Sequence, residues 1–234
     1  IINNKKLVLF IHVPKTGGSS IKELLLNQKS NENKFELWHS SHPKLFRLVE
    51  EIDFNKYFKF CVVRNPYDRF VSIYKHQCFI PRFFKTQKNK TIKFNEIPSF
   101  LKEFAILKYN NIQINEGYNN EIDINLLTAT PDYKLFCKYL EYFFTLSHKQ
   151  KKTIIKKQST FICLDKKIAV DHIIKFENLE NDLKFIMEKF NFEGNLPAKN
   201  ISLSSNEKYI IPAKYKDMLY ELFKDDFINF NYDK

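Results

Sequence analysis

The chain has 234 residues, of which 44% are hydrophobic and 16% aromatic, and this composition excludes a disordered chain and suits one α/β domain. Its formal net charge of +11 favours an anionic partner: a nucleic acid, an acidic membrane, a polyanionic glycan or a nucleotide. Abundant lysine would give the same charge without such a partner. The longest apolar run, Leu7–Val13, is far too short to span a bilayer.

Strand and helix patterns alternate along the chain. Short apolar runs predict three buried strands: Leu7–Val13, Phe58–Val63 and Asp171–Lys175. Apolar residues at helical spacing predict helices that contain Ile21–Leu25, Pro66–Phe79, Leu179–Phe190 and Tyr215–Phe223. Alternation of this kind is typical of an α/β fold, here a P-loop-like, mostly parallel sheet with helices on both faces.

No repeat or linker divides the sequence, so we expect a single domain over residues 1–234. The segment at about 81–130 is rich in lysine and asparagine, and we expect it to be a variable insert on the substrate side. One helix is predicted within it, over Ile97–Tyr109.

The segment Pro14–Ser20 lies between the first predicted strand and the first helix. Backbone N–H groups in such a turn, together with a helix N-terminus, bind anions, and Gly17 and Gly18 would let the backbone approach an oxyanion closely. Other groups in the segment suit an anion as well: the ammonium of Lys15 and the hydroxyls of Thr16, Ser19 and Ser20. The alternative is a glycine turn with a serine N-cap.

This segment is not a Walker A loop, because its lysine precedes the glycines. Arg64 stands at the end of the second predicted strand, where a Mg²⁺-binding Asp would be expected in a nucleoside triphosphatase. The four cysteines form neither a CxxC pair nor a metal-binding spacing. We therefore predict no metal site.

Arg64 is one of only four arginines in a chain with 34 lysines, which favours a role for its planar fork of donors. Ser72 follows two turns along the next helix. Together an Arg fork and a hydroxyl at the carboxyl edge of a sheet can hold a second phosphate. The alternative for Arg64 is a structural salt bridge, and we expect Asp68 and Arg69 to cap and brace the helix.

The two segments, 12–20 and 60–74, together resemble the PAPS-dependent sulfotransferases (PAPS is 3'-phosphoadenosine-5'-phosphosulfate). The sequences of these segments are most similar to those of the carbohydrate sulfotransferases of the chondroitin, dermatan and uronyl 2-O type and their bacterial relatives. The resemblance continues in segments 158–162, 170–182 and 215–232, and fails only in the middle insert. It implies PAPS as the sulfuryl donor and PAP as its product.

The resemblance also implies roles for residues. Lys15 would stabilise the charge on the leaving oxygen, Thr16–Ser20 would cradle the 5'-phosphate, and Arg64 and Ser72 would bind the 3'-phosphate. His39, in the place of the general base in the bacterial relatives, matches better than His42. The carboxylate of Glu36 is the remaining alternative.

The expected acceptor is a hydroxyl group. The positive net charge of the chain favours an acceptor on an anionic carbohydrate. Two other functions stay open: a P-loop kinase for a small molecule, and a non-catalytic basic glycan-binding module. No nucleic-acid motif is present, and the lysines are dispersed. The expected location is the Golgi lumen if an N-terminal anchor was removed, and the cytoplasm if the source is bacterial or viral.

Overall fold

The computed structural model describes residues 1–37, 45–77, 91–93, 97, 105–107, 121–123, 127–129, 132–197 and 209–234. The chain divides into two compact units. The first, here called the sheet unit, comprises Ile1–Arg69, Lys156–Leu203 and Lys216–Lys234; the second, the helical unit, comprises Phe70–Ile155 and Ser204–Tyr215. Most of the insert expected at about 81–130 lies outside the described residues, so the single domain with an insert stays a prediction.

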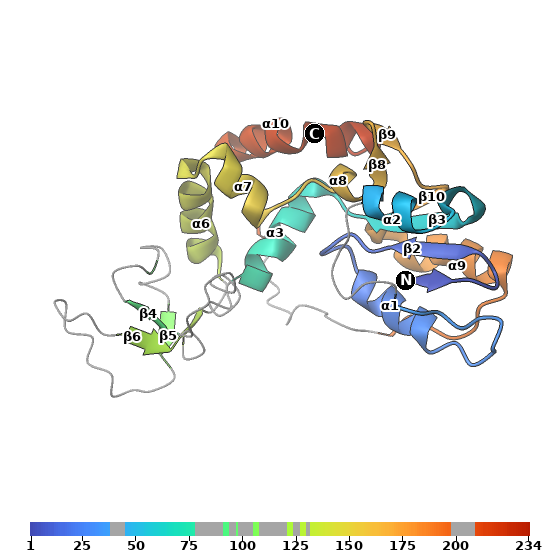
Figure 1. The fold of residues 1–234 in the computed structure, drawn as a ribbon. Helices are drawn as coiled ribbons and strands as arrows, with labels where there is room; N and C mark the ends of the chain where they lie inside the picture. Colours follow the sequence, from blue (N-terminus) through green and yellow to red (C-terminus); the bar gives the residue numbers. More distant parts are fainter. Residues whose placement is uncertain are drawn as a thin grey trace. The chain divides into compact units, whose positions relative to one another are not determined.

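The sheet unit is built on a four-stranded sheet in the order β1-β2-β3-β10 (Figure 1). Its strands are β1 (Ile2–Asn3), β2 (Val8–Ile11), β3 (Phe58–Val63) and β10 (His172–Lys175). The three predicted strands pair in parallel, and only the short edge strand β1 is antiparallel. The predicted α/β fold with a mostly parallel sheet is therefore confirmed.

Helices cover both faces of this sheet, as predicted. One face packs against α1 (Gly18–Leu26) and α9 (Leu179–Phe190), and its strands contribute Val8, Phe10, Phe60, Val62 and Ile174. The other face packs against α2 (Leu45–Glu51), α8 (Ser159–Ile162) and Phe230, which follows α10 (Ala213–Asn229), and its strands contribute Leu9, Ile11, Cys61 and Val63. Burial of both faces explains why the strands read as continuous apolar runs.

The pairing register brings three loops to one edge of the sheet. Ile11 at the end of β2 pairs with Cys61 on β3, and Lys175 at the end of β10 pairs with Val63 at the end of β3. The segments that follow these strand ends therefore emerge together at the carboxyl edge. In open parallel sheets this edge is where ligands bind.

The helical unit consists of the end of α3 (Pro66–Gln77), α6 (Tyr133–Thr145), α7 (His148–Ile154) and two strand pairs. Its core is aromatic: the Phe70 ring packs on Phe136 and Phe143, and the Tyr74 ring packs on Phe136 and Tyr139. The strand pairs are β4 (Thr91–Lys93) with β6 (Glu121–Asp123), and β5 (Ala105–Leu107) with β7 (Leu127–Ala129). The helix predicted over Ile97–Tyr109 is wrong at β5.

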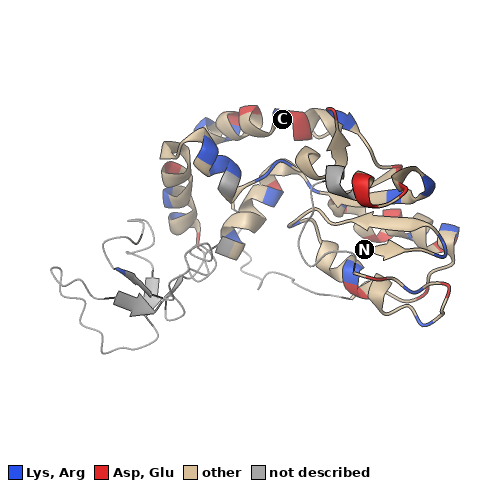
Figure 2. Ribbon diagram, in the orientation of Figure 1, with Lys and Arg blue, Asp and Glu red and all other residues tan. Residues whose placement is uncertain are grey.

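The remaining elements of the sheet unit are short. They are η1 (Phe54–Lys56), the hairpin of β8 (Cys163–Leu164) and β9 (Lys167–Ile168), and η4 (Phe176–Asn178). Lys and Arg occur on helices of both units, and α10 carries both lysines and acidic residues (Figure 2). Within the ranges that the structure describes, no helix has the length and apolar character needed to cross a membrane.

Candidate active site

The loop from the end of β2 to α1, residues 12–18, has a shape set largely by its own residues. Lys15 and Gly17 both have positive backbone φ angles, 70° and 81°. Such a conformation is free of strain for glycine but costs energy for lysine. Thr16 is fully buried and its hydroxyl donates to the carbonyl of Val13 at 2.9 Å. The Thr16 hydroxyl therefore holds the turn together.

Both glycines of this loop face protein atoms at close range. A Cβ atom on Gly18 would lie 2.2 Å from Cδ2 of His12, and a Cβ atom on Gly17 would lie 2.8 Å from Cε2 of Phe176. His12 lies just past the end of β2, with its ring 6.1 Å from that of Phe10. Glycine is therefore required here by packing, whatever ligand the loop binds.

The second segment, Arg64–Pro66, joins β3 to α3 and is held by side chains from elsewhere. The Arg64 N–H donates to Oε1 of Gln158 at 2.9 Å, and Nε2 of Gln158 donates to the Arg64 carbonyl at 2.8 Å. The Asn65 N–H donates to Oε1 of Glu177 at 2.7 Å. Oδ1 of Asn65 accepts from the Tyr67 N–H at 2.9 Å, so Asn65 caps the N-terminus of α3.

The guanidinium group of Arg64 stacks on an aromatic ring, 4.4 Å from the centroid of Phe176. Its Nε is buried and has no hydrogen-bond partner in the described ranges. Burial lowers the pKa of Arg64, while the nearby Asp68 and Glu177 raise it. An arginine side chain is charged at neutral pH, so Arg64 offers a charged donor that no described protein atom uses.

Phe176 connects the two segments, because its ring lies against Gly17 and under Arg64. The adjacent Glu177 also accepts a hydrogen bond from the Tyr232 hydroxyl at 2.8 Å. The first turn after β10 thus contacts the first loop, the second segment and the C-terminal residues. The roles of Phe176 and Glu177 could not be predicted, because a strand end followed by Phe-Glu-Asn carries no ligand signature.

Arg69 supports the first loop as well as its own helix. Its Nε donates to the Pro14 carbonyl and its Nη1 to the Lys156 carbonyl, both at 2.9 Å. The side chain is buried, which lowers its pKa to about 10, and Asp226 partly offsets this effect. Arg69 therefore acts as a brace, as expected, but it connects α3 to the first loop rather than bracing α3 alone.

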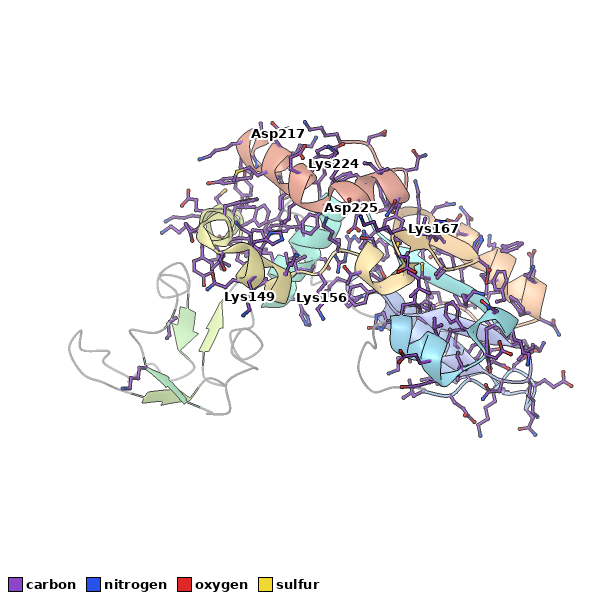
Figure 3. All side chains as sticks on the ribbon, turned by 45° about the horizontal axis from the view of Figure 1, so that its top comes forward. Lys149, Lys156, Lys167, Asp217, Lys224 and Asp225 are labelled. Carbon is purple, nitrogen blue, oxygen red and sulfur yellow. The ribbon has the colours of Figure 1, made fainter. Side chains whose placement is uncertain are left out.

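Asp226 on α10 is buried and interacts with both Arg69 and Gln158. Its two carboxylate oxygens accept hydrogen bonds from the N–H groups of Gln158, at 2.7 Å, and Ser159, at 2.9 Å. The neighbouring Asp225, labelled on α10 in Figure 3, forms a 2.6 Å ion pair with Lys157. The C-terminal helix therefore anchors the segment that holds Arg64.

The predicted site residues separate into three groups. Lys15 to Ser20 and Arg64 lie in the sheet unit, at the carboxyl edge of the sheet; Ser20 is buried and Ser19 is exposed. Ser72 lies on the part of α3 that belongs to the helical unit. His39 and His42 lie outside the described residues, whereas Glu36 is exposed and its backbone pairs with that of Ile2.

Comparison with known proteins gives a match to a family model. A model of the family described as "Sulfotransferase family" matches residues 1–233. No curated protein matches the chain. Across the described ranges, no three His, Cys, Asp or Glu side chains are grouped so that they could hold a metal ion.

Proposed function

Because this chain belongs to the sulfotransferase family, we propose that it transfers the sulfuryl group of PAPS to a hydroxyl group, most suitably one on an anionic carbohydrate. One observation carries the choice of PAPS. The glycine loop and Arg64, two groups suited to anions, meet at one sheet edge around Phe176. PAPS carries anionic groups at both its 5' and 3' positions, so a donor of this kind needs two such sites.

The first loop would receive the 5'-phosphosulfate. Its turn precedes α1, whose N-terminal N–H groups and dipole favour an anion. Lys15 adds a full positive charge beside this turn. We assign to it the stabilisation of the charge that develops on the oxygen between phosphorus and sulfur.

Arg64 would bind the 3'-phosphate through its guanidinium fork, and Ser72 would add a hydroxyl. Stacking on Phe176 restricts the guanidinium group before any ligand binds. A restricted, charged donor gives both affinity and selectivity for a phosphate. This site would distinguish PAP from nucleotides with a 5'-phosphate alone.

The reaction would be one in-line displacement without a metal. The acceptor oxygen forms a bond to sulfur, the bond between sulfur and the 5'-phosphate oxygen breaks, and the acceptor proton passes to His39. His39 stays a proposal on the family resemblance, with His42 and Glu36 as alternatives. Lys15 and the loop N–H groups stabilise the leaving charge, so that positioning and electrostatics supply most of the rate.

The net charge of +11 supports an anionic acceptor. Incubating the protein with labelled PAPS and paired glycans, one carboxylated or sulfated and one neutral, would test this. We expect label on the anionic member of each pair. Preferential labelling of the neutral glycans would overturn the acceptor class without affecting the assignment of PAPS.

Titration calorimetry with nucleotides tests the donor. We expect PAP to bind more tightly than AMP by about 2–3 kcal/mol, the contribution of a charge-assisted contact to a partly buried phosphate. EDTA should leave this difference unchanged. Equal affinities would refute the 3'-phosphate site, and Mg²⁺-dependent binding of ATP in place of PAP would support the kinase. Binding of neither nucleotide would support the glycan-binding module.

A further inference from the structure

Gln158 contacts Arg64 in a way that fixes the position of its backbone. The side-chain amide of Gln158 bonds to both the N–H and the carbonyl of Arg64, at 2.9 and 2.8 Å. The two residues are 94 positions apart in the chain. Gln158 is fully buried, so water does not compete for these bonds. One side chain thus satisfies both backbone polar groups of the residue that follows β3.

Gln158 is itself fixed from the opposite side. Asp226, also fully buried, accepts the Gln158 N–H at 2.7 Å and the Ser159 N–H at 2.9 Å. Both oxygens of the carboxylate are thus used to hold the start of α8. The backbone of Gln158 therefore has little freedom to follow Arg64 if Arg64 moves.

The side chain of Arg64 has contacts of a different kind. Its guanidinium group stacks on Phe176, and its buried Nε has no hydrogen-bond partner in the described part of the chain. Stacking restricts the plane of the group but permits it to slide along the ring. The bonds from Gln158 to the backbone are what would prevent that slide at the Cα atom.

We propose that Gln158 is a positioning residue, which acts through the backbone of Arg64 to place its guanidinium group for the 3'-phosphate of the nucleotide. This inference rests on the proposed function, because it assumes that Arg64 binds that phosphate. Gln158 itself does not need to touch the nucleotide. Recognition by a fork of donors depends on sub-ångström placement, so a small shift of Arg64 should lower selectivity for the phosphate.

The chain offers a matched control. Gln28, which follows the C-cap of α1, bonds to the N–H and the carbonyl of Glu193 in the same manner, at 2.8 and 2.6 Å. The substitutions Gln158→Met and Gln28→Met each remove one such pair of bonds at nearly constant side-chain volume, and Gln28→Met also removes a 3.0 Å bond to the Leu24 carbonyl. Only the first removes bonds to Arg64.

The quantity to measure is the ratio of the dissociation constants for AMP and PAP. This ratio reports selectivity for the 3'-phosphate and does not depend on the fraction of folded protein. We expect Gln158→Met to lower it by about tenfold, the equivalent of one lost charge-assisted contact, and Gln28→Met to leave it unchanged. In an Arg64→Ala background, Gln158→Met should lower it no further.

The outcomes separate the two claims. If the unmodified protein binds PAP and AMP equally, the proposed function fails. If it prefers PAP and Gln158→Met keeps the full preference, or lowers it equally in the Arg64→Ala background, the positioning role is overturned. Should Gln158→Met fail to fold, Gln158→Glu keeps the acceptor for the Arg64 N–H and loses the amide donor, and the same ratio decides.

Discussion

The two segments at the carboxyl edge of the sheet, residues 12–18 and Arg64–Pro66, are built in opposite ways. The first takes its shape mostly from its own residues: positive φ angles at Lys15 and Gly17, and the hydroxyl of Thr16 on a carbonyl three residues back. The second is held by side chains that are 94 and 112 positions away in the chain. Substitutions within the first segment should therefore do most damage there, whereas the second should be vulnerable to distant changes.

The largest effect is expected at Lys15. Lys15→Ala should lower kcat by about two to three orders of magnitude and weaken PAP binding much less, because the charge acts mainly in the transition state. Lys15→Gly should lose the same activity but relieve the positive φ angle, and so be more stable than Lys15→Ala by about 1 kcal/mol. Initial rates, calorimetry and thermal unfolding measure the three quantities. Normal kcat with a large loss of affinity would make Lys15 only an anchor.

The next effect concerns the second segment. Arg64→Ala should weaken PAP binding by about 2–3 kcal/mol with little change for AMP. Arg64→Lys should recover only a small part, because an ammonium group cannot stack on Phe176 and present a planar fork as Arg64 does. Calorimetry on both variants tests this. Full affinity in Arg64→Lys would mean that charge alone is needed and that the remote contacts serve stability only.

A smaller effect is expected at Gly18, where a Cβ atom would meet the His12 ring. Gly18→Ala should lower the free energy of unfolding by about 1–3 kcal/mol through overpacking. Adding His12→Ala should recover most of this loss, since the atoms that clash are then absent. Chemical denaturation of the two single variants and the double variant measures the coupling. Additive losses would show that the strain lies in the backbone of the loop.

Much of the fold could be predicted because the elements that carry it have strong local patterns. The three parallel strands are buried on both faces and read as apolar runs, whereas β1, with only two residues, is too short for a pattern. The helix expected over Ile97–Tyr109 failed because Ala105–Leu107 pairs with a distant strand. No prediction was made for α6 and α7, although Asp132 and the Ser147–Gln150 capping box are recognisable helix starts.

The site shows the same division. The tight turn of the glycine loop could be predicted from its residue types, and its binding of an anion stays a prediction. The rarity of arginine singles out Arg64 as a candidate, and its role stays a prediction, but its structural partners could not be predicted. Gln158 and Asp226 carry ordinary side chains, and only the fold brings them to the end of β3. Phe176 likewise gains its role from the pairing of β10 with β3.

The smallest effect is a dependence on pH that enters through β10, the strand that leads to Phe176 and Glu177. His172 begins this strand, its ring lies 4.9 Å from that of Phe185, and its buried Nε2 has no hydrogen-bond partner among the described residues. Burial lowers the pKa of His172, with Asp182 raising it and Lys189 lowering it. The folded protein thus favours the neutral ring.

The sign of the effect follows from this shift. Above the ordinary histidine pKa of about 6.5, the ring is neutral in both the folded and the unfolded chain, and the free energy of unfolding is unaffected. Below it, the unfolded chain takes up the proton first, so stability should fall as the pH drops from about 6.5 toward the lowered pKa of the folded ring. His172→Phe should show a shallower fall in Tm over this range.

Amide exchange at matched acid pH can then locate the loss of stability. The Asn65 N–H, which Glu177 holds beyond β10, should be better protected in His172→Phe than in the unmodified protein. The Ser20 N–H, which donates to the Gly17 carbonyl within the first segment and α1, should be protected equally in both. Equal changes at both amides would show that the two segments open as one unit, and the contrast between a locally built and a remotely held segment would then be wrong.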